Sequence, residues 1–226
     1  MRRILLIAAI AMVVGCNATA APDVKIETDE QKALYSLGYL ISGNIKSFEL
    51  SDAELAIVKA GLTDGVLKKK AQIDPQSYVQ KLQALQTTRM AAAATRDKAA
   101  GEAFIAKAAA EKGATKLPSG MVITTIKEGT GESPVAADTV KVHYHGTLVS
   151  GDVFDSSVQR GQPIDFPLNG VIPCWTEGVQ KIKVGGKAKL ICPSNLAYGD
   201  QGRPPTIPPG ATLIFEVELL EIVKSK

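Results

Sequence analysis

Apolar residues recur at helical spacing through the first third of the chain. One stripe begins at Leu34 and a second at Leu55, each with apolar side chains three and four positions apart. That period is typical of amphipathic helices. Two residue pairs near the starts of these stripes have the spacing of a capping box, in which side chains bond the free N–H groups of a helix start. They are Thr28 with Gln31 and Ser51 with Glu54. The pattern predicts two short helices.

A third helical segment starts at Asp74, where an aspartate N-cap followed by Pro75 is a typical beginning. Residues 76–112 are rich in Ala, Lys, Glu and Gln, and no further proline occurs before Pro118. A continuous helix of this length would extend on the order of 55 Å. Only its first part carries an apolar stripe, and residues 91–94 have little to bury. We therefore expect a long, solvated arm.

After Pro118 the pattern changes to short β-type runs separated by glycine and proline. In the longest run Val140, Val142 and Tyr144 alternate with other residues, as in a strand with one buried face. A short helix is expected over residues 173–181. The predicted strands cover residues 121–126, 139–148, 187–192 and 212–222. The predicted fold is α+β, with an all-helical segment followed by an antiparallel sheet wrapped around a short helix.

These elements divide the chain into a helical domain at residues 22–73, a connecting helix at 74–117 and a β-rich domain at 118–226. The helical domain has only a small core of its own, and small cores are hard to stabilise. We therefore expect its apolar stripes to pack against a second copy. The predicted contact runs from about residue 24 to 85 and makes a homodimer.

Residues 1–21 have the pattern of an export signal. Two arginines precede an unbroken apolar run at residues 4–14, which is too short to span a bilayer but suits a signal-peptide core. Two processing sites remain open. Residues 18–20 (Ala-Thr-Ala) fit a small-x-small cleavage site, whereas residues 13–16 resemble a bacterial lipobox that would lipidate Cys16, and we place the lipobox slightly ahead. Either site predicts the bacterial cell envelope, in the periplasm or anchored by lipid to the outer membrane.

Composition excludes several classes of protein. Of the 226 residues, 45% are hydrophobic and 22% charged, an ordinary globular balance that argues against wholesale disorder and a polytopic membrane protein. A formal charge of +3 argues against a dedicated nucleic-acid binder. Membrane contact is expected only through a lipid on Cys16. The other two cysteines, Cys174 and Cys192, are either a disulfide or two buried thiols, and the residues alone leave this open.

Motifs in the β-rich domain resemble those of FKBP-type peptidyl-prolyl cis-trans isomerases, in the family's order and over about 100 residues. The helices upstream, including YSLGY at residues 35–39, resemble the dimerisation segment of the macrophage infectivity potentiator class of bacterial FKBPs. The motifs of the β-rich domain are VHYHG at 142–146, FDSS at 154–157, VIPCW at 171–175, LAYG at 196–199, IPP at 207–209 and ATLIFEV at 211–217.

The resemblance implies an isomerase of X-Pro peptide bonds that needs no cofactor and no metal. It places Trp175 beneath the proline ring, and Asp155 at the pocket wall beside the matching Tyr144 and Arg160. The resemblance also implies that the Tyr198 hydroxyl donates a hydrogen bond to a substrate carbonyl. The implied catalytic residues are Tyr144, Phe154, Asp155 and Tyr198, and the implied substrate-binding residues are Arg160, Phe166, Val171, Ile172, Trp175, Ile207 and Phe215.

Some positions depart from the family. Ile164 stands where an aromatic residue is common, which implies a broader subsite. Thr206 replaces an apolar flap residue, which weakens the expectation of macrolide inhibitor binding. In the family fold Cys174 and Cys192 lie at the start of the short helix and at the end of a neighbouring strand, which makes a disulfide between them plausible.

Two further hypotheses concern function. The expected partners are unfolded or partly folded envelope proteins that contain proline. The rival hypothesis is a holdase chaperone whose proline pocket grips its clients and isomerises them only incidentally. The presence of Asp155, Trp175 and Tyr198 favours catalysis over this hypothesis. His143 and His145 form a His-x-His pair, which we interpret as ordinary packed or surface histidines because no third ligand has metal-site spacing.

Overall fold

The computed structural model describes residues 24–223. The chain divides into two compact units, residues 1–41 and 42–226, and each is described by itself. The predicted signal at residues 1–21 and the candidate lipidation site Cys16 lie outside the described residues. Within the described part, no helix is long and apolar enough to cross a membrane.

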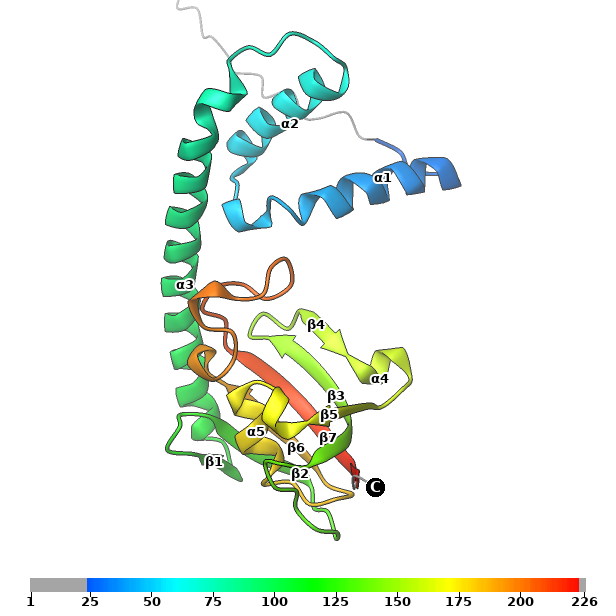
Figure 1. Ribbon diagram of the computed structural model, residues 1–226, viewed down its shortest axis with the longest axis vertical. Coiled ribbons are helices and arrows are strands. Elements are labelled where there is room, and N and C mark those ends of the chain that lie inside the picture. Colours follow the sequence, from blue (N-terminus) through cyan, green and yellow to red (C-terminus); the bar gives the residue numbers. More distant parts are fainter. Residues whose placement is uncertain (1–23, 224–226) are drawn as a thin grey trace, which may run out of the picture. The chain divides into compact units, whose positions relative to one another are not determined.

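Helix α1 (Asp29–Ser42) is the regular element of the first unit (Figure 1). The predicted capping box at its start is confirmed. The backbone N–H of Gln31 donates to Thr28 Oγ1 at 3.2 Å, and the N–H of Thr28 donates to Gln31 Oε1 at 3.0 Å. The apolar side chains of α1 are exposed, so this helix has no core of its own.

In the second unit, hydrogen bonds and an ion pair between polar side chains connect the first two helical elements to the long helix that follows them. Helix α2 (Asp52–Val66) begins with the predicted capping box of Ser51 and Glu54, which is confirmed. Arg89 of α3 (Val79–Ala109) binds Glu54 and also donates to the carbonyl of Phe48 at the end of η1 (Lys46–Phe48). The hydrogen bonds from Arg89 and Ser51 lower the pKa of Glu54 to about 2. Glu54 therefore stays charged at any physiological pH.

The predicted connecting helix is shorter than its sequence pattern suggests. A 3-10 turn, η2 (Pro75–Tyr78), precedes α3, and Asp74 caps that turn by accepting from the N–H of Gln76. The long helix then ends at Ala109. Gly113, at φ +82°, turns the chain into a strand, β1 (Ala114–Lys116). Residues 114–116 are thus part of the sheet and not of the helix.

The expectation that residues 91–94 are solvated holds for the exposed Ala91 and Ala92 and is wrong for the next two residues. Ala93 and Ala94 are buried, because they face the loop that precedes the last strand. A Cβ on Gly210 of that loop would lie 2.4 Å from the backbone oxygen of Ala94. About two helical turns further along α3, a Cβ on Gly101 would lie 2.1 Å from Thr212 Oγ1. Small residues on both sides let α3 approach the loop closely.

Replacing Gly101 by alanine should lower the free energy of unfolding by about 1–3 kcal/mol, the usual cost of overpacking a close contact. Alanine favours the helix by roughly 0.8–1.0 kcal/mol, but the new Cβ would overlap Thr212. Gly65→Ala is the matched control, since Gly65 lies in α2 with nothing within 4 Å. Urea unfolding compares the three proteins. Equal stabilities of the two variants would contradict the docking of α3.

An antiparallel sheet forms the β-rich domain (Figure 1). Its strand order is β1-β2-β6-β7-β3-β4, and β5 also pairs with β3. In β3 the alternation of Val140, Val142 and Tyr144 toward the core is confirmed. The further strands are β2 (Val122–Lys127), β3 (Thr139–Leu148), β4 (Val153–Ser156), β5 (Ile164–Pro167), β6 (Lys187–Cys192) and β7 (Leu213–Val223).

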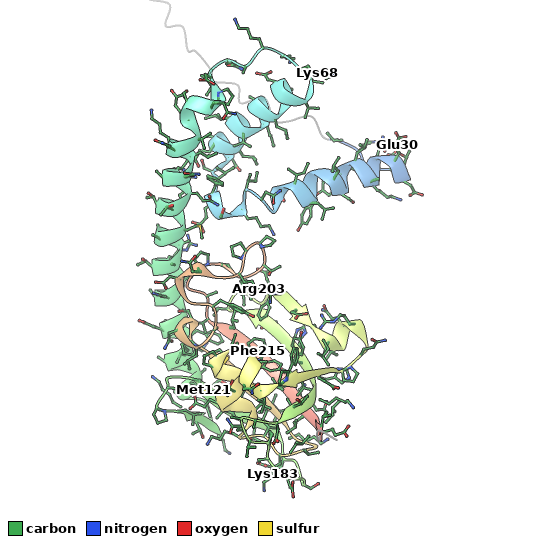
Figure 2. The ribbon with its side chains drawn as sticks, in the orientation of Figure 1. Glu30, Lys68, Met121, Lys183, Arg203 and Phe215 are labelled. Atoms are coloured by element: carbon green, nitrogen blue, oxygen red, sulfur yellow. A yellow bond between two sulfur atoms is a disulfide. The ribbon has the colours of Figure 1, made fainter. Side chains whose placement is uncertain are left out.

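The two faces of the sheet are covered differently. Helix α5 (Pro173–Val179) packs on one face, where Leu190 and Phe215 belong to the main core. The end of α3 covers the other face, where Ile105 packs against Ile191. Short helical turns connect the strands: α4 (Ser157–Arg160), η3 (Leu168–Gly170), η4 (Ser194–Leu196) and η5 (Gly199–Gln201). The predicted α+β fold, with a sheet wrapped around a short helix, is confirmed. Figure 2 shows the side chains that fill this domain.

Candidate active site

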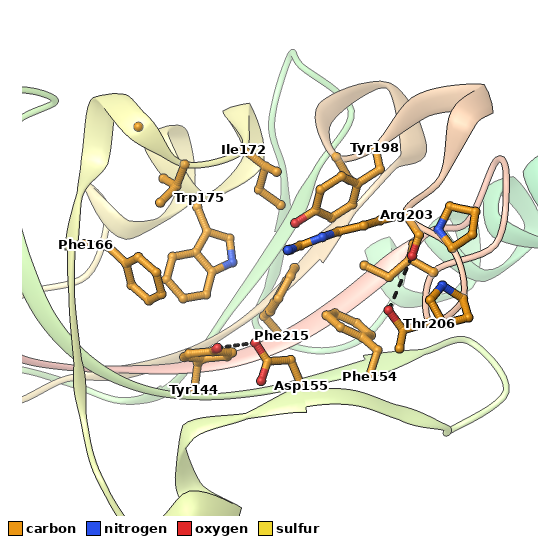
Figure 3. A pocket seen from close by; sticks show the side chains of 16 residues that line it. Tyr144, Phe154, Asp155, Phe166, Ile172, Trp175, Tyr198, Arg203, Thr206 and Phe215 are labelled. Carbon is orange, nitrogen blue, oxygen red and sulfur yellow. Dashed lines mark hydrogen bonds between the residues drawn. The ribbon is translucent and has the colours of Figure 1, made fainter. Parts of the chain in front are cut away.

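A pocket of about 870 Å³ opens between α5, the sheet and the loop after β6. Aromatic and aliphatic side chains dominate its walls, and Asp155 and Arg203 are its charged lining residues (Figure 3). The structure brings nearly all of the predicted site residues to this pocket. Those that line it are Tyr144, Phe154, Asp155, Phe166, Val171, Ile172, Trp175, Tyr198, Ile207 and Phe215.

Trp175 forms the floor of the pocket. Pro173 starts α5, and the helix carries the indole into the sheet, where it is only 4% exposed. Its ring meets Tyr144, Phe166 and Phe215 edge to face, at centroid distances of 5.2, 5.5 and 5.3 Å. Aromatic rings prefer such tilted contacts. The floor is therefore a tightly packed aromatic surface, in which the buried indole N–H is the one polar group of Trp175 and makes no hydrogen bond within residues 24–223.

Asp155 stands at the wall with its charge already compensated. Its carboxylate accepts hydrogen bonds from the Tyr144 hydroxyl and from Arg160, and Arg160 Nη2 also donates to the Tyr144 oxygen at 3.0 Å. Gly146 is the register partner of Asp155, and a Cβ there would lie 2.7 Å from the Phe154 ring. The predicted residue Arg160 thus lies behind Asp155 and acts on the pocket through it.

The loop after η4 closes the pocket on the opposite side, and we call residues 202–207 the flap. Arg203 and Ile207 bond each other's backbone, with N–H to oxygen distances of 2.8 and 3.0 Å. Ile207 is buried under this turn. Tyr198 precedes the flap, and within residues 24–223 its hydroxyl makes no hydrogen bond, so it is available to a ligand.

Comparison with known proteins connects this pocket to an enzyme family. The model of the FKBP-type peptidyl-prolyl cis-trans isomerase domain matches residues 130–220, and the domain amino-terminal to such isomerases matches residues 30–122. The FKBP-type isomerase FkpA of Escherichia coli K12 is 40% identical over 220 residues, covering 91% of this chain and 80% of that protein. The chain belongs to the FKBP family.

Two further relatives extend the match. The outer membrane protein MIP of Legionella longbeachae is 35% identical over 233 residues and covers both chains fully. The crystal structure of FkpA from Escherichia coli has a TM-score of 0.63 at 38% identity, and covers 89% of this chain and all of that one. The resemblance drawn from the motifs is confirmed, and the chain is an FKBP-type peptidyl-prolyl cis-trans isomerase with an amino-terminal domain.

The pKa of Asp155 bears on the state of this FKBP pocket. Burial raises that pKa, but the hydrogen bonds from Tyr144 and Arg160 and the charge of Arg160 outweigh burial, so the pKa lies below its ordinary value. Burial and the Asp155 bond raise the pKa of Tyr144. The site therefore holds an ionised aspartate and a neutral tyrosine over the physiological range.

The activity should consequently be independent of pH from about 5 to about 8. A carboxylate whose folded pKa is lowered stabilises the folded site above its ordinary pKa of about 3.9, and that stabilisation is lost as the pH falls through the folded value. Activity and stability should both decline only below about pH 4. NMR exchange of an X-Pro peptide measures this without a coupling protease. A midpoint near pH 6 would contradict the assignment.

The cysteines lie beside the floor. In the structure Cys174 and Cys192 are joined by a disulfide, with their Cα atoms 5.7 Å apart. Cys174 directly precedes Trp175 on α5, and Cys192 ends β6. The bond therefore ties the helix that carries the indole to the sheet.

The histidines bond neighbouring serines. His143 Nδ1 lies 3.1 Å from Ser157 Oγ, and His145 Nδ1 lies 3.0 Å from Ser156 Oγ. No group of three metal ligands occurs among the described residues. The two imidazoles connect β3 with the last residue of β4 and the first residue of α4.

The sequence analysis missed several residues that line the pocket. Gly170 directly precedes the motif at 171–175 and Ala197 lies within the motif at 196–199, and their small side chains gave no reason to single them out. Arg203 was not singled out, and Thr206 and Ile207 were the flap residues that the sequence analysis considered. Its guanidinium lies over the Tyr198 ring, 5.9 Å from the centroid, and a single charged residue in a loop carries no periodic signal.

Proposed function

We propose that this pocket catalyses rotation about X-Pro bonds by binding the twisted amide more tightly than the planar one. The observation that carries the proposal is the aromatic floor, Trp175, facing a wall where Asp155 is held ionised but already paired. A proline ring would rest on the indole, while the free Tyr198 hydroxyl would donate to a substrate carbonyl.

The physical reason lies in the amide itself. Rotation from trans to cis faces a barrier of about 18–20 kcal/mol, because it breaks the resonance that keeps the peptide planar. Only X-Pro bonds have nearly balanced end states. The planar amide is the more charge-separated form, so an apolar pocket favours the twisted form, and this differential binding is catalysis. Lowering the barrier by about 4 kcal/mol accelerates rotation roughly a thousandfold.

Each pocket residue has a separate role in binding or positioning, and none of these roles involves a covalent step. Phe166, Trp175 and Phe215 exclude water from the proline ring, which keeps the surroundings of the amide apolar. Tyr144 and Arg160 hold Asp155 in one position, so its negative charge lies at a fixed place on the wall. No proton is transferred in this mechanism, and the assigned roles need no nucleophile.

The helical elements support a homodimer as the working form. Apolar side chains on α1 and α2 are more than half exposed, which is costly for a monomer in water. These side chains would pack against a second copy. They are Leu34, Leu37, Leu40, Ile57, Leu62 and Val66. Sedimentation equilibrium should give a mass twice that of the chain. The Leu62→Glu variant should give the mass of a single chain. A native monomer at micromolar concentration would contradict the dimer.

We place the protein in the bacterial cell envelope, where it assists the folding of exported chains that contain proline. The apolar leader with its lipobox-like end supports export and a lipid on Cys16, and one relative bears the name outer membrane protein. Mass spectrometry of the mature amino terminus distinguishes a lipidated Cys16 from cleavage before Ala21. The pocket would also admit a macrolide inhibitor, weakly because of the polar Thr206 on the flap.

A double variant separates catalysis from chaperone action. Asp155→Ala with Tyr198→Phe should lower the isomerisation rate of a Leu-Pro peptide while leaving suppression of client aggregation intact, if the exposed helices bind clients independently. Equal loss of both activities would defeat an independent chaperone role. No acceleration by the folded native protein would instead defeat the isomerase proposal.

A further inference from the structure

Arg203 carries a positive charge that the proposed mechanism does not use. Within residues 24–223 it has no ion-pair partner, although it lines the pocket. The acidic residue that lines the pocket, Asp155, and the acidic residue nearest to Arg203 in the sequence, Asp200, both have other partners. Asp155 is bound by Arg160, and Asp200 pairs with Lys98 at 2.5 Å. The pocket therefore holds one uncompensated cation.

The flap anchors the backbone from which this cation extends. Backbone bonds between Arg203 and Ile207 hold the base of the side chain. The guanidinium lies over the ring of Tyr198, 5.9 Å from its centroid, and a cation over an aromatic face is attracted by the ring. Figure 3 shows the side chain running from the flap into the pocket beside Tyr198. The charge thus lies next to the hydroxyl assigned to the substrate carbonyl.

We infer that Arg203 binds the carboxylate of an acidic residue next to the substrate proline, so that it sets a preference for Glu or Asp at that position. The inference rests on the proposed isomerase site and names a substrate class for it. A guanidinium offers a planar fork of N–H donors that matches a carboxylate in geometry as well as charge. Arg203 is exposed at the edge of the pocket, so the attraction acts partly through solvent and is of moderate size.

A simpler interpretation is that Arg203 only stacks on Tyr198 as an exposed surface residue. The two interpretations predict different results for substrates of the same shape and different charge. Stacking alone gives equal rates for a glutamate and a glutamine beside proline. Carboxylate binding favours glutamate, and the preference weakens with salt, because charges in contact with solvent are screened over about 10 Å at 0.1 M.

The experiment measures kcat/KM by NMR exchange for peptides that are identical except for Glu or Gln next to proline, placed before it in one pair and after it in another. For the native protein we expect glutamate to exceed glutamine by about fivefold in one pair, the ratio that corresponds to about 1 kcal/mol. Arg203→Gln should bring that ratio to about 1, and Arg203→Lys should retain part of it.

Lys127→Gln is the matched control, because it removes the same charge from the exposed end of β2. It should leave the glutamate-to-glutamine ratio unchanged. A ratio near 1 in both native pairs, a ratio that survives in Arg203→Gln, or one that Lys127→Gln also abolishes would overturn the inference. A Leu-Pro peptide is measured alongside. If it is not accelerated, the isomerase proposal itself fails, whereas acceleration without a charge preference defeats only the role of Arg203.

Discussion

Replacing Trp175 by alanine should lower kcat/KM for a Leu-Pro peptide by between about tenfold and a hundredfold. The indole is the surface on which the proline ring would rest, and burying a side chain of that size contributes about 1.5–3 kcal/mol. If this contact is made more fully in the twisted state, its loss appears in the rate. The same change should lower the free energy of unfolding by about 3–5 kcal/mol, because three aromatic rings pack against the indole.

A loss of activity caused by unfolding must be distinguished from loss of the floor. Trp175→Phe serves this purpose, since it keeps an aromatic surface and should retain more activity and more stability than alanine. Ile126→Ala, at a half-exposed position on β2, controls for the assay. Rates are compared at a temperature where circular dichroism shows every variant to be folded. A folded Trp175→Ala protein with native kcat/KM would contradict the assigned floor.

Replacing both Cys174 and Cys192 by alanine should lower the free energy of unfolding by about 3 kcal/mol. A bond that closes a loop of this length removes conformational freedom from the unfolded chain, and loops of about 15 residues gain about that much. The sequence separation here is 18 residues. Because Cys174 precedes Trp175 on α5, the double variant should also hold the indole less firmly and lose part of its activity.

The reductant response is the internal control for this second prediction. Urea unfolding of the native protein should shift to lower urea when a thiol reductant is present, whereas the double-alanine variant should unfold at the same urea concentration with and without it. Free thiols at both positions in protein prepared from the periplasm, detected by mass spectrometry, would show that the bond does not form there.

Long periodic segments were the part of the fold that could be predicted. Both capping boxes and the bounds of β3 and β6 follow from local spacing, which depends on neighbouring residues only. The strands β1, β4 and β5 were missed because each has three or four residues, too few to establish a period. Their positions depend on the longer strands with which they pair.

The buried part of α3 shows a second reason why the sequence pattern alone does not predict burial. Ala94 is small and could lie in water or against a surface, and the decision is made by Gly210, which is more than a hundred residues away in the sequence. In the pocket, motif resemblance found most of the lining residues because the family pattern contains them. It did not show that Arg203 has no ion-pair partner among residues 24–223, since that depends on where Asp155 and Asp200 find theirs.

Isomerisation of a Leu-Pro peptide by the mature protein, followed by NMR exchange in H₂O and in D₂O, tests the central claim most directly. The account predicts acceleration on the order of a thousandfold. It also predicts a rate ratio between the two solvents close to 1, because an apolar pocket that binds the twisted amide moves no proton. Absence of acceleration, or a ratio of about 2 or more with Asp155 or Tyr198 required for it, would contradict that claim.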